Sequence, residues 1–173
     1  MSTTTRMMDG YNIGNRLIVM DNGYAAQIGS PLDVYEHPAT RFVAGFIGSP
    51  AMNFLDVRLS PGGEAVELPG DIKLPLANGH NPEHGGKEVV MGVRPEHFEL
   101  ADKEAATLHL KVDHVELLGA DTLVHGHYGE NKTLLTLRLT DIQHFKKNTI
   151  LPLIVPPQKI HLFDKETGNR IGK

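Results

Sequence analysis

Apolar residues recur at two different spacings along this chain, and the change falls near residue 50. Beyond residue 50, short apolar or alternating runs are separated by glycine, proline and asparagine turns about every ten residues. Short strands at such a spacing are typical of a barrel or a sandwich, and a barrel leaves no open sheet edge. We therefore predict a mainly β protein in which residues 51–173 form one β-barrel domain.

Residues 1–50 combine strand and helix signals. Two apolar runs within residues 16–29 flank Asn22 and Gly23, and an Asn-Gly pair between such runs is a strong hairpin signal. A short helical connector is expected to follow this β-hairpin. We treat residues 1–50 as a unit distinct from the barrel.

The connector is predicted to contain two helices. Ser30 and Pro31 have the side chains preferred at the N-cap and at the first helical position. Pro38 interrupts this helix and is expected to open a second one, which Gly48 and Pro50 bring to an end. The second helix has an apolar face with a 3.6-residue period, which consists of Phe42, Val43, Phe46 and Ile47.

Composition and charge exclude several classes of function. The chain carries 17 Lys and Arg against 21 Asp and Glu, and 6% of its residues are aromatic. It therefore lacks the basic surface and the stacking side chains expected of a nucleic-acid-binding barrel. Because the sequence has no cysteine, disulfides, thiolate metal sites and cysteine nucleophiles are excluded together. No apolar run approaches the roughly 18 residues of a membrane-spanning helix, so we expect a cytoplasmic protein.

Motifs that would identify an enzyme or a cofactor site are not found in the sequence. The nearest approach to a nucleotide-binding phosphate loop is Gly86-Lys87, but a glutamate follows and the first glycine of the motif is missing. The G-x-S-x-G, H-E-x-x-H and G-x-G-x-x-G patterns are absent as well. We therefore predict no catalytic residue and no cofactor.

The most distinctive polar cluster is Arg94-Pro95-Glu96-His97, which directly follows an apolar strand. Proline holds the preceding residue extended, so Arg94 and Glu96 are expected to project together. Such a pair suits the charges of a partner, and an arginine fork also binds a carboxylate or a phosphate. The alternative is an ion pair that closes the barrel. An acid–base role is disfavoured, because no nucleophile or pocket is indicated.

His125 and His127 flank Gly126 on a predicted strand and should point to the same face. With a third ligand from elsewhere in the chain, two such imidazoles can chelate a transition metal. We favour the simpler interpretation, a pair of solvated strand residues, and predict no metal site.

Four segments occur in the same order in a known family, namely GSPLDVYEHPATRFVAGFIGSPAMNFL, GVRPEH, VELLGAD and HLFDKETGNRI. Together they resemble ATPase subunits of ATP-binding-cassette (ABC) importers of the maltose and sn-glycerol-3-phosphate type. Two further segments, ELPGDIKLPL and LGADTLVHGHYGE, are most similar to the glycerol-3-phosphate branch. The resemblance extends from about residue 16 to the end of the chain.

This resemblance implies a domain organisation. Residues 1–50 correspond to the end of a nucleotide-binding domain and a helical linker, and residues 51–173 to a regulatory OB-like β-barrel of the transport-associated type. In the family, the phosphate loop, signature motif, catalytic glutamate and switch histidine lie upstream of these segments. The apolar face of the second helix is then expected to pack between the nucleotide-binding remnant and the barrel.

The implied function is that of a non-catalytic regulatory and dimerisation domain of an importer for sugars or sn-glycerol-3-phosphate. Family members pair through the barrel, so the expected partners are a second copy of the chain, a nucleotide-binding domain and membrane permease subunits. The parent complex implies a cytoplasmic position, peripheral to the inner membrane and without direct membrane insertion. Arg94, Glu96 and His97 are the candidate residues for binding a regulatory protein or a small ligand.

Other classes of function are compatible with parts of the sequence. A stand-alone barrel that binds a phosphate ester or another oxyanion through Arg94 is the main alternative. Binding of single-stranded nucleic acid is disfavoured by the composition, and enzymatic activity by the missing motifs. Titration with glycerol-3-phosphate and simple oxyanions separates the small-ligand alternative from a purely mechanical module.

Overall fold

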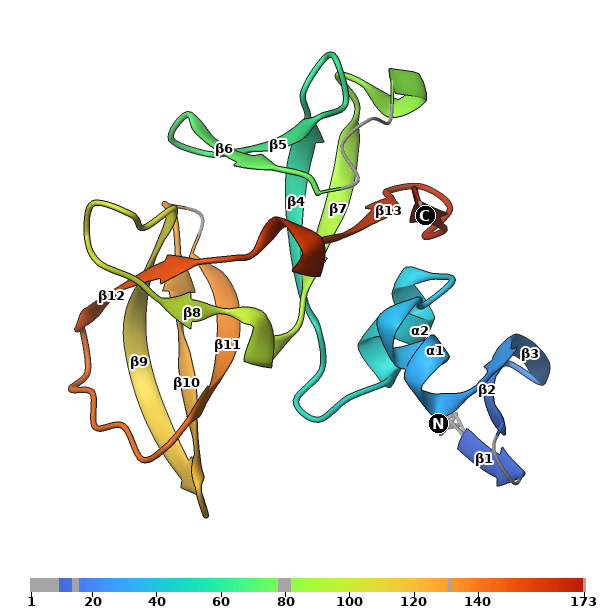
Figure 1. Ribbon diagram of the computed structural model, residues 1–173, viewed down its shortest axis with the longest axis horizontal. Helices are drawn as coiled ribbons and strands as arrows, with labels where there is room; N and C mark the ends of the chain where they lie inside the picture. Colours follow the sequence, from blue (N-terminus) through green and yellow to red (C-terminus); the bar gives the residue numbers. More distant parts are fainter. Residues whose placement is uncertain (1–9, 14–15, 78–81, 131, 173) are drawn as a thin grey trace, which may run out of the picture.

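The computed structural model describes residues 10–13, 16–77, 82–130 and 132–172. A small hairpin unit, residues 10–29, and two short helices lie beside a larger β body, residues 53–171 (Figure 1). The elements in chain order are β1 (Gly10–Ile13), β2 (Arg16–Asp21), β3 (Tyr24–Gly29), α1 (Pro31–Glu36), α2 (Arg41–Phe46), β4 (Asn53–Leu59), β5 (Ala65–Leu68), β6 (Ile72–Pro75), η1 (Pro82–His84), β7 (Glu88–Val93), η2 (Pro95–His97), β8 (Glu99–Leu100), β9 (Leu108–Leu118), β10 (Asp121–Tyr128), β11 (Thr133–Thr140), β12 (Ile150–Ile154), η3 (Pro157–Lys159), β13 (His161–Asp164) and β14 (Arg170–Ile171).

Two curled antiparallel sheets form the β body and share one apolar core. One sheet has the strand order β11-β10-β9-β12-β8 and the other β14-β13-β7-β4-β5-β6. Because side chains alternate along a strand, every second residue of β4 and β11 enters the core. Core residues with no exposed surface include Leu59, Val66, Met91, Leu108, Leu110, Leu137 and Leu153. The prediction of a mainly β, barrel-like body is confirmed.

The predicted hairpin is present, because β2 and β3 pair antiparallel on either side of Asn22 and Gly23. The φ angle is +49° at Asn22 and +86° at Gly23, and a type I′ hairpin turn requires positive values at both positions. β1 adds a third strand on the other edge of β2, which the sequence pattern did not indicate.

α1 begins where the sequence predicts. Pro31 is its first residue, and the hydroxyl of the N-cap Ser30 accepts a hydrogen bond from the backbone N–H of Asp33 at 3.1 Å. This bond satisfies one of the N–H groups that have no partner within the first helical turn.

No helix in the described part of the chain is long and apolar enough to cross a membrane.

α2 begins at Arg41 and not at Pro38, so this part of the prediction is wrong. The Gln27 side chain on β3 donates to the carbonyl of His37 at 2.9 Å and accepts from the N–H of Ala39 at 2.8 Å. Both backbone groups are thereby held outside a helix. Thr40 becomes the N-cap instead, and its hydroxyl accepts from a backbone N–H in the first turn of α2 at 3.2 Å.

The side chain of Asn53, at the start of β4, joins the two sheets. Its amide nitrogen donates to the carbonyl of Thr136 at 2.8 Å and to the carbonyl of Val93 at 3.2 Å. Its oxygen accepts from the N–H of Thr136 at 2.8 Å. β11, which contains Thr136, is the outermost strand of its sheet. One buried amide therefore takes the place of a neighbouring strand at this edge.

Candidate functional site

Arg94 lies directly after β7 and is almost completely buried, with 1% of its surface exposed. Its backbone is extended, with φ at −72° and ψ at 148°, as expected for a residue before proline. Pro95 then begins the 3₁₀ turn η2. In this position the Arg94 side chain reaches the helical connector.

The Arg94 guanidinium binds the C-terminal ends of both helices. One terminal nitrogen donates to the carbonyl of Ile47 at 2.6 Å, and the other donates to the carbonyl of Tyr35 at 2.5 Å. The guanidinium carbon also lies 3.6 Å from the centroid of the Tyr35 ring, within the range of a cation–π interaction. Carbonyl groups at a helix C-terminus carry partial negative charge, which favours a cation there. Arg94 therefore ties α1 and α2 to the end of β7.

Glu96 and His97 have different surroundings from Arg94. A 3₁₀ turn has about three residues per turn, so the residues of η2 point in different directions. Glu96 is exposed, whereas Arg94 points into the protein, and the expectation that the two project together is wrong. His97 is half-buried and faces the same cavity as Arg94.

This cavity has a volume of about 220 Å³ and lies between the end of α1, the end of β7 and the C-terminal strands. Its lining contains more basic than acidic side chains, and Glu36 is the one acidic residue among the lining residues that the structure describes. The basic and imidazole groups in the lining are His37, Arg94, His97, Lys159, His161 and Arg170.

Burial and, after it, the positive charges around the cavity disfavour protonation of the two imidazoles. Burial, followed by the charges of Lys159 and Arg94, lowers the pKa of His97 to about 4. Burial and then Arg170 lower the pKa of His161 to about 4 as well. Burial also lowers the pKa of Arg94 to about 10. Both imidazoles are therefore neutral at pH 7.

Several polar atoms of this site have unused hydrogen-bonding capacity. Nδ1 of His97, Nδ1 of His161 and Nε of Arg94 are buried and have no hydrogen-bond partner among the residues that the structure describes. Buried polar groups are usually paired, so such atoms call for a partner from outside the chain or a specific chemical role. Since the site is rich in donors and positive charge, it suits a small anion.

Sequence reasoning singled out Arg94 and His97 but missed Lys159, His161 and Arg170. The register between β13 and β7 brings these parts together, because His161 lies opposite Gly92, two residues before Arg94. Neither strand carries a local signal for this pairing. The HLFD run of β13 indicated a strand, but it did not indicate which strand would be its neighbour.

The predicted apolar face of α2 packs on the hairpin unit. Val43 is fully buried in a cluster with Val19 of β2 and Val34 of α1, and Ile47 packs at its margin. The rings of Phe42 and Phe46 stack with their centroids 6.3 Å apart and remain partly exposed.

The contact of α2 with the β body comes from a different face of the helix. Ala44 is buried in a second cluster with Met52, Val90 and Phe163. α2 thus lies between the hairpin unit and the β body, and the residue at the centre of the latter contact, Ala44, was not among those that we singled out.

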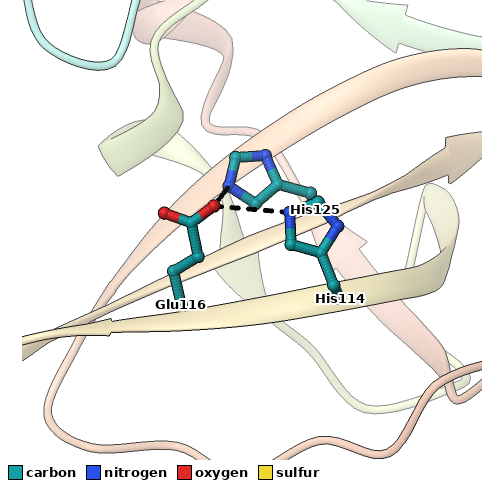
Figure 2. A group of neighbouring side chains, drawn as sticks. All are labelled: His114, Glu116 and His125. Carbon is teal, nitrogen blue, oxygen red and sulfur yellow. Dashed lines mark ion pairs between the residues drawn. The ribbon is translucent and has the colours of Figure 1, made fainter.

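His125 and His127 do not share one set of neighbours. Nδ1 of His127 lies 2.6 Å from a carboxylate oxygen of Asp113, whereas His125 lies beside His114 and Glu116 (Figure 2). The cause is a β-bulge in β9, because the residue paired with β10 jumps from His114 to Val112 and leaves Asp113 as an extra residue. The idea that His125 and His127 chelate one ion together is therefore wrong.

Two domain families match the β body. The MalK OB fold domain matches residues 48–98, and the TOBE domain matches residues 91–163. The two matches overlap at the end of β7 and in η2, the segment that contains Arg94.

Three similar proteins carry the same name. This chain is 44% identical over 168 residues to the sn-glycerol-3-phosphate import ATP-binding protein UgpC of Salmonella paratyphi A and of Salmonella typhi, and 42% identical to that of Escherichia coli O157:H7. Each match covers 97% of this chain and 46% of the relative, so the chain spans about half the length of these relatives.

A solved structure with a similar fold is that of the cytoplasmic molybdate-binding protein ModG with molybdate bound. It superposes with a TM-score of 0.51 and 19% sequence identity, and the match covers 64% of this chain and 94% of ModG. At this identity the similarity concerns the fold alone. The two domain families and the 44% identity to UgpC show that the chain is homologous to the C-terminal part of ABC importer ATPase subunits, the part that contains the MalK OB fold and TOBE domains.

Proposed function

We propose that this chain acts as a regulatory and dimerisation module of an ABC importer ATPase subunit for sugars or sn-glycerol-3-phosphate, and that it does not hydrolyse ATP itself. The observation that carries the proposal is the match of nearly the whole chain to 46% of the length of UgpC. By analogy with these relatives, its partners are a nucleotide-binding domain and permease subunits. Its place in the cell is then the cytoplasmic side of the inner membrane.

The contacts of Arg94 support a mechanical role. The guanidinium holds the carbonyl ends of α1 and α2, and α2 also packs on the hairpin unit. A displacement of the hairpin unit is therefore passed to the β body through short, directional bonds and not through a flexible linker. Such a connection suits a domain that follows the movement of a neighbouring ATPase domain.

Exposed apolar side chains at one end of the five-stranded sheet offer a surface for pairing. Leu117 and Leu118 at the end of β9 are 49% and 54% exposed, and Ile142 is 58% exposed. Ile142 lies near them, because the next residue, Gln143, donates its N–H to Thr122, which is paired with Leu117. We propose that this group, the β9–β10 tip, contacts a second copy of the chain about a two-fold axis.

The first prediction concerns this pairing. We expect the purified chain to be a dimer in sedimentation equilibrium, and Leu118→Lys to raise its dissociation constant at least about tenfold, because a charge replaces an apolar contact. Leu134→Lys is the matched control, since Leu134 is 70% exposed and pairs with His127, away from the tip. A monomeric parent chain, or equal weakening by both variants, contradicts the dimer proposal.

Release of phosphate from ATP by the chain contradicts its non-catalytic role.

A second candidate function is the binding of a small oxyanion in the basic cavity, and the buried, unpartnered Nδ1 atoms of His97 and His161 favour it. An anion there would accept hydrogen bonds from protonated imidazoles and would offset the positive charge of Arg94. Anion binding would then be coupled to proton uptake, because the pKa of both imidazoles is about 4 without the anion.

The second prediction follows from this coupling. We expect sulfate, whose charge is constant between pH 8 and pH 5.5, to bind several-fold more tightly at the lower pH, as measured by calorimetry. Lys159→Gln should weaken binding, whereas Lys103→Gln, an exposed lysine outside the cavity lining, should not. Affinity that is independent of pH and of Lys159 contradicts the anion site. Titration with glycerol-3-phosphate then shows whether a phosphate ester is preferred over the inorganic ion.

A further inference from the structure

Three side chains on the outer face of the five-stranded sheet bring their ligand atoms together. His114 and Glu116 are two residues apart on β9, and His125 on β10 lies directly opposite His114 in the strand pairing. Directly opposed side chains on neighbouring antiparallel strands have Cβ atoms about 5 Å apart. In Figure 2, both imidazole rings are directed toward the carboxylate of Glu116.

The distances suit a shared ion. Nε2 of His114 and Nε2 of His125 each lie 3.4 Å from the same carboxylate oxygen of Glu116. Two ligands that are 2.0–2.1 Å from a tetrahedral zinc ion are about 3.4 Å apart. The ligand atoms of the three residues all lie within 4.8 Å of one another. The side chain of His114 is 60% exposed and its ring stacks on that of His125 with the centroids 4.4 Å apart, so a rotation of the exposed ring can bring its Nε2 closer to the other two ligand atoms.

His125 is already oriented as a ligand. Its Nδ1 lies 3.1 Å from the hydroxyl of Thr136, which is directly opposite on β11. When Nδ1–H donates to this hydroxyl, the lone pair is on Nε2, the atom that faces Glu116. Nε2 is buried and has no hydrogen-bond partner among the described residues. The arrangement has the form of a metal-binding histidine held by an outer partner.

We propose that His114, Glu116 and His125 form a binding site for one divalent transition-metal cation of the zinc class. Two imidazoles and one carboxylate are a ligand set typical of zinc, with a fourth position left for water or an external ligand. Imidazole ligands disfavour magnesium and calcium, which prefer oxygen. The site joins β9 to β10 next to the β-bulge, and none of its three residues is among those that line the basic cavity.

The third prediction tests this site. The full chain is titrated with Zn²⁺ in competition with a chromogenic chelator, and one tight site per chain is expected. We expect His125→Gln and His114→Gln to weaken this site by at least about tenfold, and Thr136→Val by about tenfold through loss of the bond to Nδ1. All three positions lie on the sheet surface, and thermal unfolding without metal is expected to be little changed.

His127→Gln is the matched control. This residue lies on the same strand two positions away and pairs with Asp113, outside the cluster. His127→Gln should keep the parent affinity for Zn²⁺. Mg²⁺ should not compete with Zn²⁺ for the site in the parent chain. Parent affinity in the His114→Gln/His125→Gln double variant, or an equal loss in His127→Gln, would overturn the proposal and leave the three residues as an exposed ion-pair cluster.

Discussion

Replacement of Arg94 by alanine is expected to lower the free energy of unfolding by about 3 kcal/mol, because the carbonyls of Ile47 and Tyr35 lose charged donors. The substitution should also release α1 and α2 from the β body before global unfolding. Urea denaturation followed by circular dichroism measures the first effect. Hydrogen exchange of the backbone amides in residues 31–47 measures the second, and it should rise well above that of β9 and β10.

Two variants show whether the planar fork of the Arg94 guanidinium is responsible for this stabilisation. Arg94→Lys keeps the charge but cannot donate to both carbonyls with a planar fork, so we expect it to recover only a small part of the lost stability. Arg138→Ala is the matched control. Two guanidinium nitrogens of Arg138 also contact an acceptor, the Asp121 carboxylate, but this arginine is exposed. The substitution should leave the urea midpoint almost unchanged. Full recovery by lysine, or unchanged exchange in residues 31–47, contradicts the coupling role of Arg94.

Features that depend on local signals could be predicted from the sequence. The hairpin follows from Asn22 and Gly23, since few residue pairs accept positive φ at both positions. The start of α1 follows from the cap at Ser30. The start of α2 was misplaced because Gln27, 12 residues before Ala39, binds the backbone there. A propensity argument for residues 38–41 does not include that side chain.

The candidate site was only partly predictable for a similar reason. Arg94 stood out as a charged residue after an apolar strand, but its partners are backbone carbonyls, which have no sequence signature. His161 joins the cavity through the register of β13 on β7, which is a tertiary property. His125 likewise meets His114 and Glu116 through the register of β10 on β9, and the bulge at Asp113 then shifts this register before His127. Alternation along β10 predicted the face of His125 but not its neighbours.

The link between the two sheets leads to the second large expected effect. Asn53→Ala should lower the free energy of unfolding by about 3 kcal/mol, because it leaves the N–H and carbonyl of Thr136 without their partner at the edge of β11. The loss should be visible as a lower urea midpoint. It should also appear as faster amide exchange of Thr136, because the freed edge of the strand becomes accessible to water.

The chemistry of the amide, and not its volume, is the reason for this effect, and Asn53→Asp separates the two. A carboxylate of nearly the same size keeps the acceptor for the Thr136 N–H but faces the carbonyls of Thr136 and Val93 with negative charge. Burial and these carbonyls would raise the pKa of the new carboxyl, so the folded state would bind a proton more tightly than the unfolded state. The variant should therefore be strongly destabilised at neutral pH and should regain stability relative to the parent as the pH falls. Asn169→Ala, at an exposed asparagine, should have the stability of the parent at neutral pH and at the lower pH. If Asn53→Asp is as stable as the parent at neutral pH, packing and not the paired amide joins the sheets.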